Sequence, residues 1–177
     1  DWTWIKSRSA AYSHHLFDVV RGVEKALQSN STNAESNQPS SGYLTAFNSD
    51  GFSVAQGSFS LTNVNENSTT YVAWNWLAGG TASSNTDGSI TSTVSANTTS
   101  GFSIVSFTGN GTAGATVGHG LGVAPLMVIT KNRDSTSEWG VYHSALGGTK
   151  ALLLNQNYNQ QTNSLYWNNT NPSSTVF

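Results

Sequence analysis

The run HHLFDVVRGVEKALQSN, from His14 to Asn30, decides between two folds. Its apolar residues recur at the three- and four-residue intervals of an amphipathic helix. They are Leu16, Val19, Val20, Val23 and Leu27. A helix that begins with two histidines and Asp18 would invite an enzymatic interpretation, so the choice between helix and strand also bears on function.

A repeat within the chain resolves this choice. The segment WTWIKSR (2–8) aligns with MVITKNR (127–133), and EKALQSN (24–30) aligns with TKALLLN (149–155). Both alignments share an offset of 125 residues, since 133 minus 8 equals 150 minus 25. This constant register predicts that the two copies share one fold.

The second copy of the opening run, WGVYHSALGGTKALLLN (139–155), is incompatible with a helix. Gly147 and Gly148 lie in its middle, and two glycines would cost about 2 kcal/mol relative to alanine. WGVYH alternates between apolar and small or polar residues, and KALLLN is an apolar run of strand length. Both copies are therefore predicted to form two strands joined by a glycine-containing turn.

Short segments of strand character recur along the rest of the chain, with turn residues between them. These are YLTAF (43–47), TYVAWNW (70–76), GFSIVSFTG (101–109) and PLMVIT (125–130). The last is continuously apolar, which is expected of a strand covered on both faces. The pattern predicts an all-β fold: an antiparallel β-sandwich of lectin-like or jelly-roll style with short loops and little or no helix.

The repeat also predicts the domain organisation. Residues 81–100 contain few large apolar side chains and are expected to form a polar linker or a hairpin that turns at Asp87 and Gly88. Residues 1–80 would be the C-terminal part of one repeat unit and residues 101–177 the N-terminal part of the next. A single permuted sandwich is the alternative.

Composition excludes several classes of function. Only 9% of the 177 residues are charged, against about 25% in an ordinary domain, whereas 11% are aromatic. The net charge of −2 gives no basic field for nucleic acid, and no apolar run reaches the roughly 20 residues of a membrane span. The absence of cysteine excludes disulfides and thiolate zinc sites. We expect neither a nucleic-acid partner nor membrane insertion.

Motifs that resemble catalytic sites lack the necessary context. GNGTAG (109–114) has the spacing of a dinucleotide-binding loop, but the following ATVGHGLGVAP cannot open a helix. His119 lies among glycines, so its ring is expected to fix a tight turn by hydrogen bonds to the backbone. His14, His15 and Asp18 could bind a metal, but the second copy keeps neither paired histidines nor a carboxylate, so a solvated strand edge is expected instead.

Carboxylates are too scattered for a glycosidase pair, and the two nearest each other, Asp134 and Glu138, fall on one predicted loop. We therefore predict no enzyme, with no catalytic residue, metal or cofactor. All 7 Lys and Arg residues lie in the repeated segments. They could contact an anionic glycan or pair with carboxylates such as Asp18 at strand edges.

Aromatic residues provide the remaining signal for binding, because Trp and Tyr rings stack on sugar rings while amides and hydroxyls bond their hydroxyl groups. The candidate ligand-binding residues are Trp139, Tyr142, Tyr166 and Trp167. Packing in the core is the alternative role for each of them.

GHGLGVAPLMVITKNR, followed by WGVYHSALGGTKALLLN and YWNN, resembles a repeat of large tail-fibre and appendage proteins of bacteriophages, especially marine and cyanophage types. WIKSRSAAYSHHLFDVVRG, FNSDGFSV and TTYVAWNW resemble the other half of the same repeat, so the resemblance spans nearly the whole chain. The family brings no catalytic residues to carry over.

The resemblance implies a phage virion structural protein, in a tail fibre or in a capsid or tail appendage, that contributes to virion architecture and host-surface attachment. Its partners would be other virion proteins or further copies in a homo-oligomer, with a host-surface glycan as a candidate ligand. Its location would be the extracellular virion. The alternative function is a non-catalytic carbohydrate-binding module of lectin-like type.

Overall fold

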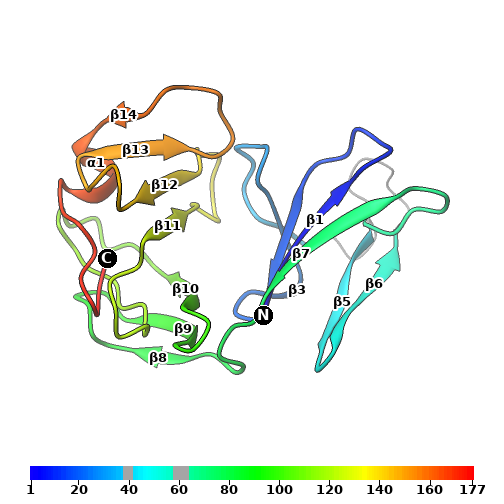
Figure 1. Cartoon of the computed structure of the whole chain (residues 1–177), viewed down its shortest axis with the longest axis horizontal. Helices are drawn as coiled ribbons and strands as arrows, with labels where there is room; N and C mark the ends of the chain where they lie inside the picture. Colours follow the sequence, from blue (N-terminus) through cyan, green and yellow to red (C-terminus); the bar gives the residue numbers. More distant parts are fainter. Residues whose placement is uncertain (38–41, 58–63) are drawn as a thin grey trace. The chain divides into compact units, whose positions relative to one another are not determined.

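The computed structural model describes residues 1–37, 42–57 and 64–177, and these are almost entirely β-structure (Figure 1). The only helix in the described ranges is the single turn α1, Ser164–Trp167. None of the described helical structure is long and apolar enough to cross a membrane. The chain divides into two compact units: Asp1–Trp76 with Asn132–Ser137, and Leu77–Lys131 with Glu138–Phe177.

The first unit contains a five-stranded antiparallel sheet with the order β4-β3-β2-β1-β7 and a separate β5–β6 hairpin. The sheet strands are β1 (Trp2–Ser7), β2 (His15–Asp18), β3 (Gly22–Gln28), β4 (Ser36–Asn37) and β7 (Tyr71–Trp76). The hairpin strands are β5 (Gly42–Asn48) and β6 (Gly51–Gln56). The run from His14 to Asn30 thus forms strands, as the repeat predicted.

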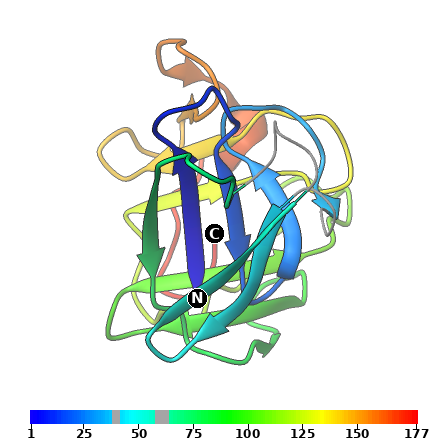
Figure 2. The same ribbon diagram turned by 90° about the vertical axis from the view of Figure 1, so that its right-hand side faces the viewer.

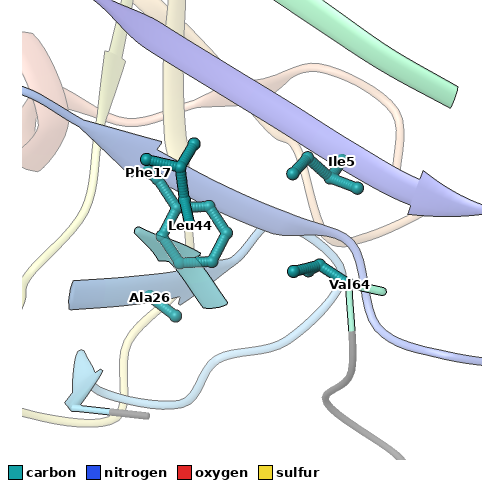
Figure 3. Packing of buried hydrophobic residues seen from close by; sticks show 5 residues of the cluster. All are labelled: Ile5, Phe17, Ala26, Leu44 and Val64. Atoms are coloured by element: carbon teal, nitrogen blue, oxygen red, sulfur yellow. The ribbon is translucent and has the colours of Figure 1, made fainter. Parts of the chain in front are cut away.

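Successive side chains of a strand point to opposite faces of the sheet, and one of these faces supplies the core of the first unit. Ile5, Phe17 and Ala26 point from the sheet toward Leu44 of the hairpin and toward Val64 (Figure 3). Each of these five side chains is at most 5% exposed, and the hairpin crosses the sheet in the view of Figure 2. This unit therefore has two packed β-layers, which confirms the predicted antiparallel sandwich.

The second unit holds two antiparallel sheets with the orders β10-β9-β8 and β11-β12-β13-β14. The strands of the first are β8 (Ser83–Asn85), β9 (Ser92–Asn97) and β10 (Phe102–Phe107). Those of the second are β11 (Met127–Thr130), β12 (Gly140–His143), β13 (Lys150–Leu153) and β14 (Gln161–Thr162). Of the two alternatives for residues 81–100, the structure has a hairpin, because β8 and β9 pair with Asn85 opposite Ser92.

The repeat is present in the backbone pairing of the two units. Trp2 faces Asp18 across β1 and β2, and Met127 faces His143 across β11 and β12. The same offset of 125 residues relates the next two pairs of strands. Across β2 and β3, His15 faces Gln28, and across β12 and β13, Gly140 faces Leu153. Across β3 and β4, Lys25 faces Asn37, and across β13 and β14, Lys150 faces Thr162. Strands β1–β4 and β11–β14 are therefore two copies of one antiparallel meander.

Asparagine side chains at corresponding positions bond the backbone at the strand ends in both copies. The Asn30 side-chain oxygen accepts a hydrogen bond from the His14 backbone N–H at 2.9 Å, and Asn155 accepts one from Trp139 at 3.0 Å. Gly147 has a positive φ of 75°, and its counterpart Gly22 has one of 101°. This conformation is accessible to glycine at little cost, which explains a glycine in each turn.

One expectation about burial is wrong. Strand β11 lies in the apolar run PLMVIT, which was expected to be covered on both faces. Leu126, Met127 and Ile129 are instead 71%, 55% and 37% exposed. The physical reason is that, among the strands described, β11 pairs with β12 alone and forms the edge of its sheet.

His15 makes the stability of the first unit depend on pH. Burial lowers the pKa of His15 to about 4, since the imidazole lies beside Phe17 on the core face and is 2% exposed. The unfolded chain, with an ordinary histidine pKa near 6.5, binds the proton more tightly, so stability is lost as the pH falls from about 6.5 toward 4. We expect the free energy of unfolding in urea to fall by about 2 kcal/mol between pH 7 and pH 5.

The variant His15→Gln tests whether this residue is responsible. It has no titrating group at this position, so most of the pH dependence in this range should disappear. An unchanged pH profile in this variant would contradict the assignment to His15.

Candidate functional site

Four tryptophans lie together on the face of the first sheet opposite to the core. Strand β1 contributes Trp2 and Trp4, because its even-numbered residues point away from the core residues Thr3 and Ile5. Strand β7 contributes Trp76 opposite Trp2 and Trp74 opposite Trp4. Two Trp-x-Trp segments separated by some seventy residues of sequence therefore meet in adjacent strands.

The four rings form a continuous aromatic surface. The Trp2 and Trp76 ring centroids are 4.6 Å apart, and those of Trp4 and Trp74 are 5.8 Å apart. Trp2 also contacts Trp4 at 5.9 Å with an interplanar angle of 61°. Edge-to-face and tilted contacts of this kind stabilise aromatic pairs. Trp74 and Trp76 nevertheless remain 47% and 39% exposed, so this surface also faces solvent.

A shallow open pocket runs over this surface, and we call it the tryptophan groove. It is lined by Trp4, Lys6, His14, Trp74 and Trp76. The Lys6 ammonium is held at one side, where it donates to the Ser7 carbonyl at 2.7 Å. Burial, followed by the positive charge of Lys6, lowers the pKa of His14, so its ring is neutral at pH 7. The groove thus combines flat aromatic faces with one cation and one neutral imidazole.

Two of the aromatic residues selected from the sequence have packing roles instead. Trp139 is 5% exposed and Tyr142 is 3% exposed, so neither presents a ring face on which a ligand could stack. Tyr142 lies 125 residues after Phe17 and holds the same position in its strand pair, opposite Val128 as Phe17 is opposite Thr3. Its side chain therefore points to the buried face, as that of Phe17 does. The repeat offset therefore contained the signal that Tyr142 is a core residue.

Tyr166 and Trp167 lie on α1 and are half-buried. The Trp167 ring packs edge-on against Tyr142 at 5.9 Å. A Cβ on Gly140 would lie only 2.9 Å from the Tyr166 ring, so Tyr166 fills the space that His15 occupies at the corresponding position of the first unit. The structure brings Tyr142, Tyr166 and Trp167 together as packing around β12.

The histidines do not form a metal site. His15 faces the core while Asp18 accepts hydrogen bonds from the backbone N–H groups of Val20 and Arg21, at 3.1 and 2.8 Å. The expected solvated strand edge is also wrong, because both His15 and Asp18 are buried. The ranges with described coordinates contain no group of three or more His, Cys, Asp or Glu residues arranged to hold a metal ion.

His119 acts as predicted. Its Nδ1 accepts from the Leu121 backbone N–H at 3.2 Å, and its Nε2 lies 3.3 Å from the Ser173 carbonyl. The neighbouring Gly120 has a positive φ of 69°, as the turn requires. The buried imidazole therefore holds the loop before β11.

The family model of a domain of unknown function, DUF7483, matches residues 1–177. The chain belongs to this family. No curated protein and no solved structure matches it.

A polar cluster of the first unit joins four charged side chains. The Arg21 guanidinium contacts Asp18 at 2.5 Å and Glu35 at 3.1 Å, and it donates to the carbonyls of Leu16 and Lys25. Arg133 donates to both carboxylate oxygens of Glu35, at 2.8 and 2.9 Å. Two cations thus balance two anions.

This charge network is structural rather than a binding site. The Arg21, Asp18 and Glu35 side chains are only 6%, 5% and 11% exposed. Burial by itself would raise the pKa of Glu35, but the hydrogen bonds from Arg133 and Arg21 outweigh it and hold the pKa below its usual value. These pairs anchor Asn132–Ser137 to the first unit, and Arg21 and Arg133 are already engaged by protein carboxylates.

Substitution of Arg21 tests the importance of the network. Arg21→Ala leaves the buried Asp18 carboxylate without its partner, so we expect the free energy of unfolding to fall by about 3–5 kcal/mol. The exposed Arg8→Ala variant removes the same charge and should change stability by no more than about 0.5 kcal/mol. Equal urea midpoints for the two variants would show that the network does not stabilise the fold.

Proposed function

We propose that this DUF7483 domain is an architectural module of a bacteriophage virion, located in a tail fibre or another appendage that meets the host surface. The proposal is supported by the repeated meander, in which strand pairing, turn glycines and strand-closing asparagines recur at one offset. Recurrence of this kind is the signature of repeat architectures, in which successive modules stack or chain together. The resemblance of the sequence to phage appendage repeats supplies the biological setting.

The polar differences between the copies fit a passive structural role. Asp18 and Arg21 of the charge network correspond to His143 and Leu146 in the second copy. The backbone of the meander is retained although these two charged residues are replaced. A repeated catalytic site would require the same functional groups in each copy, whereas a repeated scaffold requires only the strand register.

Antibodies against the purified chain test the location. On phage particles whose genome encodes the chain, gold-labelled antibodies should decorate fibres or appendages in electron micrographs. Particles of a phage that lacks the coding sequence are the control. Intact particles without label, despite detectable protein in infected cells, would contradict the proposal.

The tryptophan groove favours a second function, namely glycan binding at the host surface. A pyranose ring has an apolar C–H face that lies flat on an indole, and burial of both surfaces is favourable. Trp74 and Trp76 present such exposed faces, while Lys6 and His14 line the groove and can bond sugar hydroxyls. The presence of Lys6 also permits a sugar with a carboxylate substituent.

Titration with host-surface oligosaccharides tests this function. Bound sugar should change the tryptophan fluorescence of the chain in a saturable manner. Trp74→Ala should weaken binding about tenfold, equivalent to about 1.4 kcal/mol, because one stacking surface is lost. Tyr158→Ala removes a ring that is 62% exposed and outside the groove, and should leave the affinity unchanged. Equal affinities for the two variants would exclude the groove as the sugar site.

A further inference from the structure

Strand β11 has an open edge on the side where its counterpart β1 pairs with β7. In the first unit β1 lies between β2 and β7, whereas β11 pairs with β12 alone among the described strands. The two strands have the same register with their shared neighbour. The comparison therefore identifies one missing position in the second meander, the position of β7.

The backbone of β11 is arranged to receive a strand there. In an antiparallel strand, successive residues direct their N–H and C=O groups to opposite edges. The Ser144 N–H donates to the Leu126 carbonyl at 2.8 Å, so Leu126 and Val128 direct these groups toward β12. Met127 and Ile129 consequently direct theirs toward the open edge.

The side chains at this edge are apolar and exposed. Leu126, Met127 and Ile129 are 71%, 55% and 37% exposed, and nearby Val123 is 61% exposed. At the corresponding positions of β1, Trp2 and Trp4 are half-buried and contact Trp76 and Trp74 of β7. A second β7-type strand would cover Met127 and Ile129 in the same way.

We propose that the open edge of β11 binds a β7-type strand from a further repeat of this domain, by antiparallel strand addition. The partner is an extended segment with apolar or aromatic residues at alternate positions, as in TTYVAWNW (69–76). By the register of the first unit, the equivalent of Trp76 lies opposite Met127 and the equivalent of Trp74 lies opposite Ile129. This inference rests on the proposed role as a repeated module and names the contact between repeats.

A synthetic peptide with the sequence TTYVAWNW, flanked by lysines for solubility, tests the proposal on the full chain. Hydrogen exchange followed by NMR should show slowing of at least about tenfold at the Met127 and Ile129 amides at saturating peptide. The matched control is the same peptide with proline in place of Val72. In the first unit, the register and the 2.7 Å bond from the Arg8 N–H to the Thr70 carbonyl direct the Val72 N–H toward β1. Proline removes the corresponding donor, so this peptide should give little protection.

A variant of the chain makes the test specific to the edge. Ile129→Pro removes an outward N–H while leaving the bonds to β12 in place, which edge strands tolerate. It should retain the far-ultraviolet circular dichroism of the parent and lose peptide binding. If it does not fold, Ile129→Lys, which places a charge at the edge, provides the same comparison.

Three results would overturn the proposal. In the first, the proline peptide protects the Met127 and Ile129 amides as well as the unmodified peptide does. In the second, only β1 amides are protected, because the peptide has replaced β7 of the same chain. In the third, protection of Met127 and Ile129 increases with protein concentration in the absence of peptide. The last would indicate pairing of β11 edges between identical copies. Antibody labelling of virions does not depend on this edge, so failure of strand addition is distinguishable from failure of the proposed function.

Discussion

The register of β1 on β2 is the constraint on which the rest of the first unit depends. Ile5 faces His15, and a slip of one residue would turn every side chain of the strand to the opposite face. Ile5 would leave the core, and the bulky Trp4 would enter it. Burial of Ile5 and Phe17 on one face thus fixes the exposure of the tryptophans on the other. The hydrophobic core depends on this pairing, and the tryptophan groove requires in addition the pairing of β1 with β7.

Local sequence patterns were sufficient for the strands because alternation and turn residues are local properties. The run from His14 to Asn30 was the exception, since Leu16, Val19 and Val23 fit a helix as well. Its second copy, with Gly147 and Gly148, removed that ambiguity. The long-range pairing was not accessible in this way: β7 returns to β1 past the β5–β6 hairpin. The tryptophan groove depends on that pairing and was missed, although both Trp-x-Trp segments were visible.

Burial of individual aromatic and charged residues was harder to predict than the strands. The sequence marks Trp139 and Tyr142 as candidates because sugar-binding sites use such rings, but the alternation of side chains along β12 turns Tyr142 inward. No local sequence pattern pairs Glu35 with Arg133, because 98 residues separate the two. The Arg21–Asp18 pair is local in sequence, whereas the pair of Arg133 with Glu35 depends on the tertiary structure.

The presence of two meanders with the same register creates a hazard during folding. Strand β1 could pair with β12, or β11 with β2, because hydrogen bonding between backbones does not distinguish the copies. Misassembly between neighbouring homologous segments is a characteristic failure of repeat proteins. The two copies differ in their side chains, for example at Trp2 and Met127 or at Asp18 and His143, so a strand that pairs across copies meets different side chains from those of its own neighbour. Such differences are what distinguishes correct pairing from crossed pairing, because the strand register is the same in both copies.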